Sequence, residues 1–175
     1  PDRALWITAV ARNTGRRVVF GRSGPGAVSA DPAPAEAVAA SCAIPGVFAP
    51  VVIGGVEYVD GGVHAPTNAD LAAGLGLDLV VVSSPMSAAR PLRPGLDLPG
   101  RQLSRITLAG EVSAVRRSGT PVLAFQPTPA DRTVMGLNAM DRSRREAVTA
   151  QARESTLRRL DRPDVKQRLA ALLTG

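Results

Sequence analysis

Two pairs of short apolar segments occur in the chain, one near its start and one at residues 51–59. Residues 5–11 and 16–20 are apolar segments joined by Asn13-Thr14-Gly15, a pattern that predicts two strands around a hairpin turn. Residues 51–53 and 56–59 flank Gly54 and Gly55, which both tolerate positive φ, and therefore predict a second tight hairpin. The second strand of that hairpin leads directly to Asp60.

Strand-like and helix-like patterns alternate along the rest of the chain. Residues 78–84 form a β-branched run typical of a strand buried on both faces of a parallel sheet, and 121–127 predict another buried strand. The proline-rich stretch 86–100 predicts a surface loop. Residues 34–43 are rich in alanine and begin with Pro34, and residues 66–75 begin with Pro66, Thr67 and Asn68; both starts are typical of a helix. In 101–118 the residues at helical spacing are Leu103, Ile106, Ala109 or Gly110, and Ser113. Helices are therefore predicted at 34–43, 66–75, 101–118, 142–160 and 162–173. This alternation predicts an α/β layered architecture.

Composition narrows the class of protein. The chain has 175 residues, 45% hydrophobic and 21% charged, which is typical of one globular domain and excludes disorder and collagen-like repeats. One cysteine and one histidine exclude a disulfide scaffold and a zinc site of Cys and His ligands, so no metal or other cofactor is predicted. The chain has no apolar run long enough to span a membrane and no signal-peptide pattern at its start.

Positive charge is concentrated in the C-terminal part. Residues 1–100 carry a net charge of −1 and residues 101–175 a net charge of +7, nearly all of it from arginine. The few aromatic residues are scattered, so a solvated helix face is favoured over nucleic-acid binding. The arginines that could instead lie against anionic lipid are Arg144, Arg145, Arg153, Arg158 and Arg159.

The densest group of candidate functional residues is Asp60-Gly61-Gly62, directly after a predicted strand. A carboxylate at a strand end followed by two glycines can be approached closely by a ligand, although Asp-Gly is also a common turn sequence. A desolvated carboxylate within hydrogen-bonding reach of a serine can act as its general base. Taken alone, this motif favours a turn; the resemblance described next is what makes Asp60 the candidate catalytic residue, with Gly61 and Gly62 as supporting residues.

The surrounding segment resembles the patatin-like phospholipase family. The resemblance rests on Ala40-Ser41-x-x-x-Pro45-Gly46-Val47-Phe48, then Tyr58-Val59-Asp60-Gly61-Gly62, then Pro66-Thr67-Asn68, and is close over residues 36–85. It implies a serine acyl hydrolase that cleaves lipid esters with a Ser-Asp dyad, in which Asp60 matches the aspartate. It assigns no role to His64, which we expect to be a loop or surface residue.

The family's Gly-x-Ser-x-Gly nucleophile elbow and its glycine-rich oxyanion loop do not occur in this chain. Ser23 lies in a sequence that is similar to this elbow but has Pro25 in place of the closing glycine, so Ser23 is rejected as the nucleophile. Ser41 and Cys42 lie in an alanine-rich segment that is expected to be buried, with Cys42 as a small core residue. We therefore expect this chain to be the C-terminal part of a patatin-like domain, lacking the N-terminal half and inactive alone.

The predicted fold is a three-layer patatin-like sheet flanked by helices and incomplete at its N-terminus. Residues 1–140 are assigned to the domain and residues 141–175 to basic helices packed on it. Lipid or acyl esters and the missing half are the expected partners, in the cytoplasm with peripheral membrane contact. A non-catalytic lipid or membrane-surface module is the alternative function. A nucleotide-binding enzyme, suggested by Gly74-Leu75-Gly76, is weaker because neither a Gly-x-Gly-x-x-Gly motif nor a Walker lysine is present.

Overall fold

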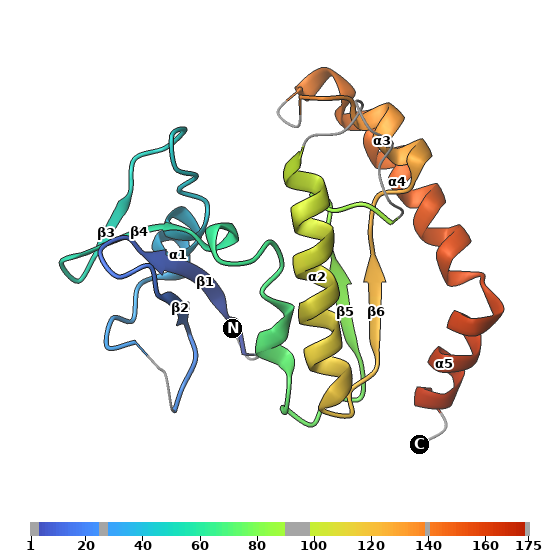
Figure 1. Cartoon of the computed structure of the whole chain (residues 1–175), viewed down its shortest axis with the longest axis horizontal. Helices are drawn as coiled ribbons and strands as arrows, with labels where there is room; N and C mark the ends of the chain where they lie inside the picture. Colours follow the sequence, from blue (N-terminus) through green and yellow to red (C-terminus); the bar gives the residue numbers. More distant parts are fainter. Residues whose placement is uncertain (1–3, 25–27, 90–98, 139–140, 174–175) are drawn as a thin grey trace. The chain divides into compact units, whose positions relative to one another are not determined.

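The computed structural model describes residues 4–24, 28–89, 99–138 and 141–173 (Figure 1). The chain divides into two compact units, Pro1–Asn68 and Ala69–Gly175, which we call unit 1 and unit 2. Helices and strands occur in both, so the predicted mixed α/β class is confirmed. The described strands form two sheets, one in each unit. The single three-layer arrangement and the boundary at residue 140 stay predictions.

Unit 1 is an antiparallel sheet with one helix packed against it. The sheet has the order β2-β1-β4-β3, and both hairpins predicted from the sequence are confirmed. At the second hairpin Gly54 and Gly55 have φ values of 57° and 78°, which side chains with a Cβ rarely adopt. The elements of unit 1 are β1 (Ile7–Ala11), β2 (Arg17–Phe20), α1 (Pro34–Ser41), β3 (Val51–Ile53), β4 (Val56–Asp60) and the 3₁₀ turn η1 (Gly61–Val63).

The core of unit 1 lies between this sheet and α1. Ala37 and Ala40 are the buried residues of α1, and their small side chains let the helix approach the strands closely. Phe20 and Tyr58 meet edge to face, with ring centroids 5.2 Å apart and an interplanar angle of 74°. This arrangement is the one that aromatic quadrupoles favour. The core thus fixes β4, which carries Asp60 at its end, against β1 and α1.

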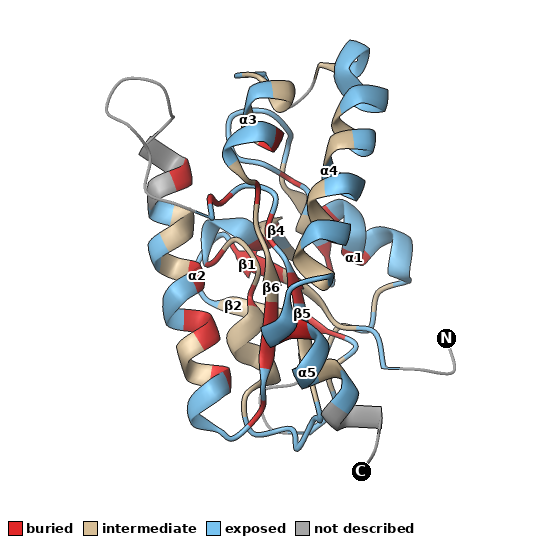
Figure 2. Cartoon of the chain, turned by 90° about the vertical axis from the view of Figure 1, so that its right-hand side faces the viewer, coloured by how far each residue is buried: buried red, intermediate tan, exposed pale blue. Residues whose placement is uncertain are grey.

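Unit 2 contains a parallel strand pair and most of the helices. Strands β5 and β6 pair in parallel, as the β-branched pattern predicted for the first of them. Leu108, Val112 and Val115 of α2 are buried with Val82 and Val122 of the strands (Figure 2). The elements of unit 2 are η2 (Ala69–Ala72), β5 (Val80–Ser83), α2 (Pro99–Arg117), β6 (Val122–Phe125), α3 (Pro129–Met135), η3 (Arg142–Arg144), α4 (Arg145–Leu160) and α5 (Pro163–Leu173).

The helix predicted at 66–75 is wrong, since this stretch forms only the short 3₁₀ turn η2. Asn68, expected to cap the helix, has a φ of 51° and directs its side-chain amide backward, to the carbonyl oxygens of Gly61 and Ala65. The backbone N–H of Ala69 is instead satisfied by the Glu111 carboxylate, at 2.9 Å. Glycines with positive φ at 74 and 76 then end the turn.

The helix predicted at 101–118 is confirmed as α2, but the residues that suggested it do not form its buried face. Leu103 and Ile106 are 66% and 59% exposed, and the helix buries Leu108, Val112 and Val115 with the polar Arg101 and Glu111. Hydrogen bonds compensate for the burial of these two polar residues. The pattern of polar and apolar residues therefore predicted the wrong buried face of α2. Of the predicted loop 86–100, residues 90–98 lie outside the described residues, and α2 begins at Pro99.

The strand predicted at 78–84 also differs in its burial. Val82 is buried, but Val81 is 59% exposed. One face of β5 is therefore uncovered among the described residues, and the prediction of burial on both faces is wrong for this chain. The helices predicted at 34–43, 142–160 and 162–173 correspond to α1, to η3 with α4, and to α5.

A buried carboxylate fastens α3 to α4. Asp131 is 7% exposed, and its carboxylate accepts hydrogen bonds of 2.7 Å from the backbone and hydroxyl of Thr128 and from the hydroxyl of Ser155. Burial raises the pKa of Asp131, but the hydrogen bonds from Ser155 and Thr128 outweigh burial and lower the pKa overall. A carboxyl group whose pKa is lowered by folding stabilises the fold above its ordinary pKa, and loses this effect as the pH falls through the folded value.

We predict that Ser155→Ala lowers the free energy of unfolding by about 2 kcal/mol at pH 7, the usual range for a hydrogen bond to a charged group. The variant should also lose part of the acid-dependent destabilisation that the wild type shows as the pH falls below 3.8, the ordinary carboxyl pKa, because its Asp131 keeps a less lowered pKa. Thermal unfolding and hydrogen exchange of α3 across this pH range measure both effects. The matched control is Thr149→Ala, whose hydroxyl bonds only the backbone within α4. Equal losses in the two variants would contradict the prediction.

Candidate functional site

Asp60 lies where β4 leaves the sheet. Its Cα pairs with that of Ala9 in β1, and its backbone N–H donates to the carbonyl oxygen of Ala43, 3.0 Å away, just beyond α1. The carboxylate Oδ1 accepts a hydrogen bond of 2.6 Å from the backbone N–H of Gly62. This bond caps the turn η1, so Asp60 is held by a strand on one side and by a turn on the other.

The two glycines after Asp60 lie where a Cβ atom would come too close to neighbouring atoms. A Cβ at Gly61 would lie 2.5 Å from the carbonyl oxygen of Thr8 and 2.5 Å from its hydroxyl oxygen, closer than real contacts allow. A Cβ at Gly62 would lie 2.9 Å from Oδ1 of Asp60 itself. A side chain at Gly61 would therefore displace the backbone of this loop, whereas one at Gly62 would push the Asp60 carboxylate aside. The supporting role of both glycines in catalysis stays a prediction.

Asn68 holds the far end of the same loop. Its Nδ2 donates to the carbonyl oxygens of Gly61 and Ala65, at 3.3 and 2.7 Å, and its Oδ1 accepts from Arg17 of β2 at 3.1 Å. The side chain is 7% exposed, so these bonds replace the water that the amide would otherwise bind. Sequence reasoning missed Asn68 and Arg17 as supporting residues. A non-glycine residue with positive φ cannot be recognised from sequence alone.

The carboxylate of Asp60 remains available for chemistry. The residue is half-buried, and no hydrogen bond to its Oδ2 comes from the residues that the structure describes. No serine hydroxyl among these residues hydrogen-bonds to Asp60 either. The hydrogen bond from Gly62 to Oδ1 therefore orients the carboxylate, and Oδ2 is free to accept a proton from a group placed beside it.

The structure places the other candidate residues away from such chemistry. Ser23 is exposed in a loop, Ser41 is half-buried at the end of α1, and His64 is exposed at the end of η1, as expected for a surface residue. Cys42 is exposed, so its expected role as a small core residue is wrong. Only Ala37 and Ala40 of α1 face the core, and Cys42 follows the last turn of the helix, outside the buried stripe. Gly74 and Gly76 precede β5, whereas a nucleotide-binding glycine loop follows a strand.

Ser155 and Asp131 form a hydrogen-bonded serine–aspartate pair, which sequence reasoning did not predict. Their oxygen atoms lie 2.7 Å apart, but the carboxylate already accepts two further hydrogen bonds from Thr128. With its pKa lowered by these bonds, which outweigh burial, Asp131 is a weak base, and we interpret the pair as structural. Thr128-Pro129-Ala130-Asp131 is a capping-box pattern that signals the bonds between Asp131 and Thr128, but it gives no signal for Ser155.

The described residues include neither a cluster of metal-ligating side chains nor a helix that could span a membrane. No group of three or more His, Cys, Asp or Glu side chains in this part of the chain could hold a metal ion. None of the helices that the structure describes is both long and apolar enough to cross a membrane.

We predict that Gly61→Ala lowers the free energy of unfolding by about 1–3 kcal/mol, the usual cost of overpacking, because the new Cβ collides with the Thr8 backbone. The matched control is Gly110→Ala in α2, where a Cβ meets nothing within 4 Å and helix propensity favours alanine. The control should be stabilised by up to about 1 kcal/mol. Chemical denaturation measures both variants, and a Gly61→Ala protein as stable as the wild type would contradict the assigned packing.

Comparison with known proteins bears on this segment. The family model described as patatin-like phospholipase matches residues 2–73, whereas no curated protein matches the chain. The match lies in the N-terminal part of this chain and ends before residue 85, where the close resemblance was expected to end. That the chain is a C-terminal part of the family's domain stays a prediction. The resemblance itself is confirmed over residues 2–73, which contain Asp60, Gly61, Gly62 and Asn68 and match the model of the patatin-like phospholipase family.

Proposed function

We propose that this chain supplies the general base of a serine acyl hydrolase, which cleaves carboxylic esters of phospholipids or neutral lipids. The observation that carries the proposal is the Asp60 carboxylate, with Oδ1 held by Gly62 and Oδ2 open, inside the segment that matches the patatin-like phospholipase family. The nucleophilic serine and the oxyanion donors would come from residues outside this chain. The chain alone would then be inactive.

In the proposed reaction the serine Oγ attacks the ester carbonyl carbon while its proton passes to Oδ2 of Asp60. The tetrahedral intermediate collapses by releasing the alcohol, which takes that proton, and leaves an acyl ester on the serine. Water then attacks the acyl ester and gives a proton to Asp60, and the serine regains this proton as the carboxylic acid leaves. The rigid setting of Asp60 keeps its base in position through both steps.

We infer that the complete domain is a three-layer sheet with helices on both faces. The exposed Val81 side chain and the two-stranded sheet β5-β6 support this, because a parallel pair is normally covered on both faces and extended by further strands. Residues 1–140 would belong to that domain, and residues 141–175 would pack on it. We place the protein in the cytoplasm, with peripheral contact to a membrane.

We predict that Asp60→Asn, introduced into the complete protein, lowers kcat/KM for ester hydrolysis by about 10²–10⁴-fold, the usual contribution of a general base. The amide keeps an oxygen for the Gly62 N–H but cannot accept the serine proton. Hydrolysis of a chromogenic ester measures the effect. The matched control is His64→Ala, four residues away and exposed, which should keep full activity. Loss of activity in the histidine variant with retention in Asp60→Asn would overturn the proposal.

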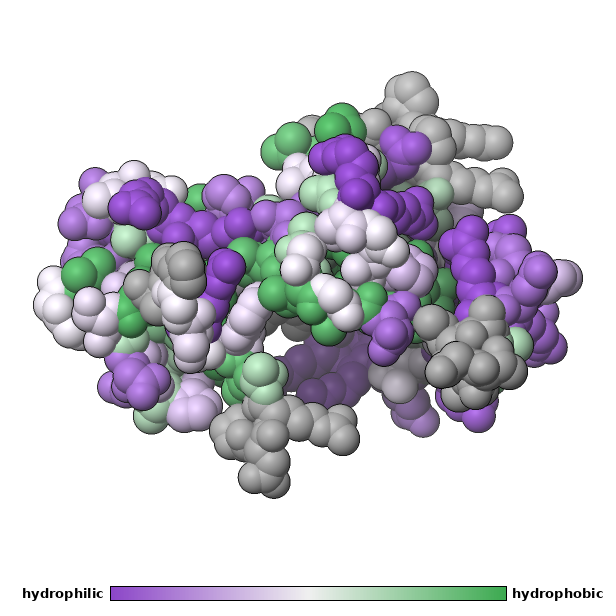
Figure 3. All heavy atoms as spheres, turned by 90° about the horizontal axis from the view of Figure 1, so that it is seen from below, coloured by the Kyte–Doolittle hydropathy of each residue, from purple (hydrophilic) through white to green (hydrophobic). Residues whose placement is uncertain are grey.

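A second candidate function is a non-catalytic module that binds a lipid or membrane surface. Arg145 and Arg153 of α4 are exposed, and Figure 3 shows hydrophilic side chains over the end of unit 2 that carries α4 and α5. Among the described residues, four other cations of this region pair with neighbouring carboxylates, which weakens their attraction for anionic lipid: Arg144 with Asp141, Arg158 with Glu154, Arg162 with Asp164 and Lys166 with Asp161.

For this module we predict sedimentation with phosphatidylglycerol vesicles but not with phosphatidylcholine vesicles, and release by salt, because the attraction is electrostatic. The double variant Arg145→Gln/Arg153→Gln should bind about 30-fold more weakly, at about 1 kcal/mol per cation near the surface. Arg12→Gln in unit 1 is the control and should bind as the wild type does. Equal binding to both kinds of vesicle would contradict this function.

A further inference from the structure

Unit 2 holds a cavity that the Asp60 site does not use. Its volume is about 820 Å³, within the range of small-molecule binding sites. It opens beside Ser83 and Phe125, the last residues of the parallel strands β5 and β6, and is closed by α3 and α4. Ligands of parallel α/β sheets bind beyond the carboxyl ends of the strands, and this cavity has that position.

Hydrogen bonds between separate segments fix one wall of the cavity. Gln126 donates to the hydroxyl of Ser87 and to the carbonyl oxygen of Ala88, both at 3.1 Å. Arg101, from α2, donates to the carbonyl oxygens of Pro85 and Ser87 at 2.9 and 3.3 Å. The segment 85–89 after β5 is thus held from two sides. Because these hydrogen bonds already hold the wall in place, little conformational entropy is lost when a ligand binds against it.

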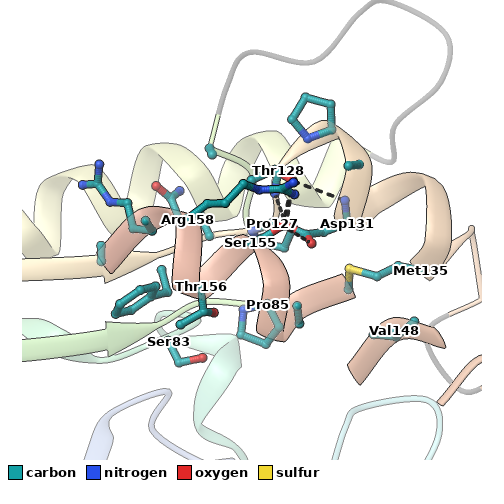
Figure 4. A pocket seen from close by; sticks show the side chains of 18 of the residues that line it. Ser83, Pro85, Pro127, Thr128, Asp131, Met135, Val148, Ser155, Thr156 and Arg158 are labelled. Carbon is teal, nitrogen blue, oxygen red and sulfur yellow. Dashed lines mark hydrogen bonds between the residues drawn. The ribbon is translucent and has the colours of Figure 1, made fainter. Parts of the chain in front are cut away.

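The opposite wall is one face of α4, apolar at its start and cationic at its end. The residues of this face follow helical spacing, and Figure 4 shows Val148, Ser155 and Thr156 around the cavity. The distance along the helix from Val148 to Arg159 is about 16 Å, eleven residues at 1.5 Å each. Met135 and Pro129 of α3 extend the apolar end. The cavity therefore suits a long apolar group with a polar head.

The charge of the cavity decides the sign of that head. Arg158, Arg159 and Arg162 line one end, where Arg158 pairs with Glu154 and Arg162 with Asp164. Arg159 is half-buried, and its guanidinium makes no hydrogen bond with the residues that the structure describes, although its charge also interacts with the Asp164 carboxylate. Three cations against two carboxylates leave one positive charge, so an anionic head is favoured at this end.

Asp131 makes the cavity directional. Its carboxylate lies toward α3 and is saturated by Thr128 and Ser155, as the dashed bonds of Figure 4 show. With three hydrogen bonds already accepted and no proton to donate, this negative carboxylate disfavours an anionic head beside Ser155. Arg159 lies one helical turn beyond Ser155, so the anionic head would lie at Arg159 and the chain would run past Thr156 toward Val148.

We propose that this cavity binds a free fatty acid, with its carboxylate on Arg159 and its hydrocarbon chain along α4. A guanidinium binds a carboxylate through paired hydrogen bonds, and the apolar walls bury the chain. About 16 Å of helix accommodates roughly a dozen carbons, at about 1.2 Å per bond of an extended chain. The inference does not depend on Asp60, because it concerns binding without hydrolysis.

Titration calorimetry of the full chain with dodecanoate tests the proposal, with dodecanol as the uncharged probe of the same length. We expect dodecanoate to bind at least tenfold more tightly than dodecanol. Arg159→Gln should weaken dodecanoate about tenfold and leave dodecanol unchanged, whereas Ala152→Phe, which fills the cavity wall, should weaken both.

Arg168→Gln is the matched control, since it removes an exposed arginine of the neighbouring helix α5 that does not line the cavity. Circular dichroism before each titration establishes that every variant is folded. Dodecanoate binding that is unaffected by Arg159→Gln, or lowered equally by Arg168→Gln, would overturn the proposal, as would binding only to phospholipid vesicles. These outcomes leave the Asp60→Asn experiment unaffected, so the two proposals fail separately.

Discussion

The position of the Asp60 carboxylate depends on a backbone contact that excludes side chains. Gly61 approaches the Thr8 carbonyl so closely that even a methyl group would not fit, and this lets the chain turn at once after β4. The turn brings the Gly62 N–H onto Oδ1 of Asp60, and Asn68 then fixes the end of the loop. One oxygen is thereby used to orient the group while the other stays open, a division that suits a base better than a fully bonded carboxylate such as Asp131.

The parts of the fold that depend on local chemistry could be predicted from the sequence. Gly54 and Gly55 require a turn with positive φ, and the short β-branched runs on either side leave few alternatives to a hairpin. The position of Asp60 at the strand end followed from this. The prediction of a helix at 66–75 failed because the Asn68 side chain donates hydrogen bonds to the carbonyl oxygens of Gly61 and Ala65. Such a contact depends on the path of the preceding loop.

The buried face of α2 and the Ser155–Asp131 contact could not be predicted because they depend on distant partners. Arg101 and Glu111 are acceptable inside only because carbonyl oxygens of the segment 85–87 and the N–H of Ala69 lie beside them. Pattern reasoning assigns such polar residues to the solvent side. Ser155 lies 24 residues from Asp131 and is one of several similar positions on α4. Only the assembled helices distinguish it from its neighbours.

The exposed position of Cys42 has a practical consequence. It is the only cysteine of the chain, so a thiol-directed fluorophore or spin label would attach at a single place without any engineered substitution. That place directly precedes Ala43, whose carbonyl oxygen receives the N–H of Asp60. A reporter attached there would sense movement of the backbone that carries the carboxylate, while every residue in contact with that carboxylate keeps its natural identity.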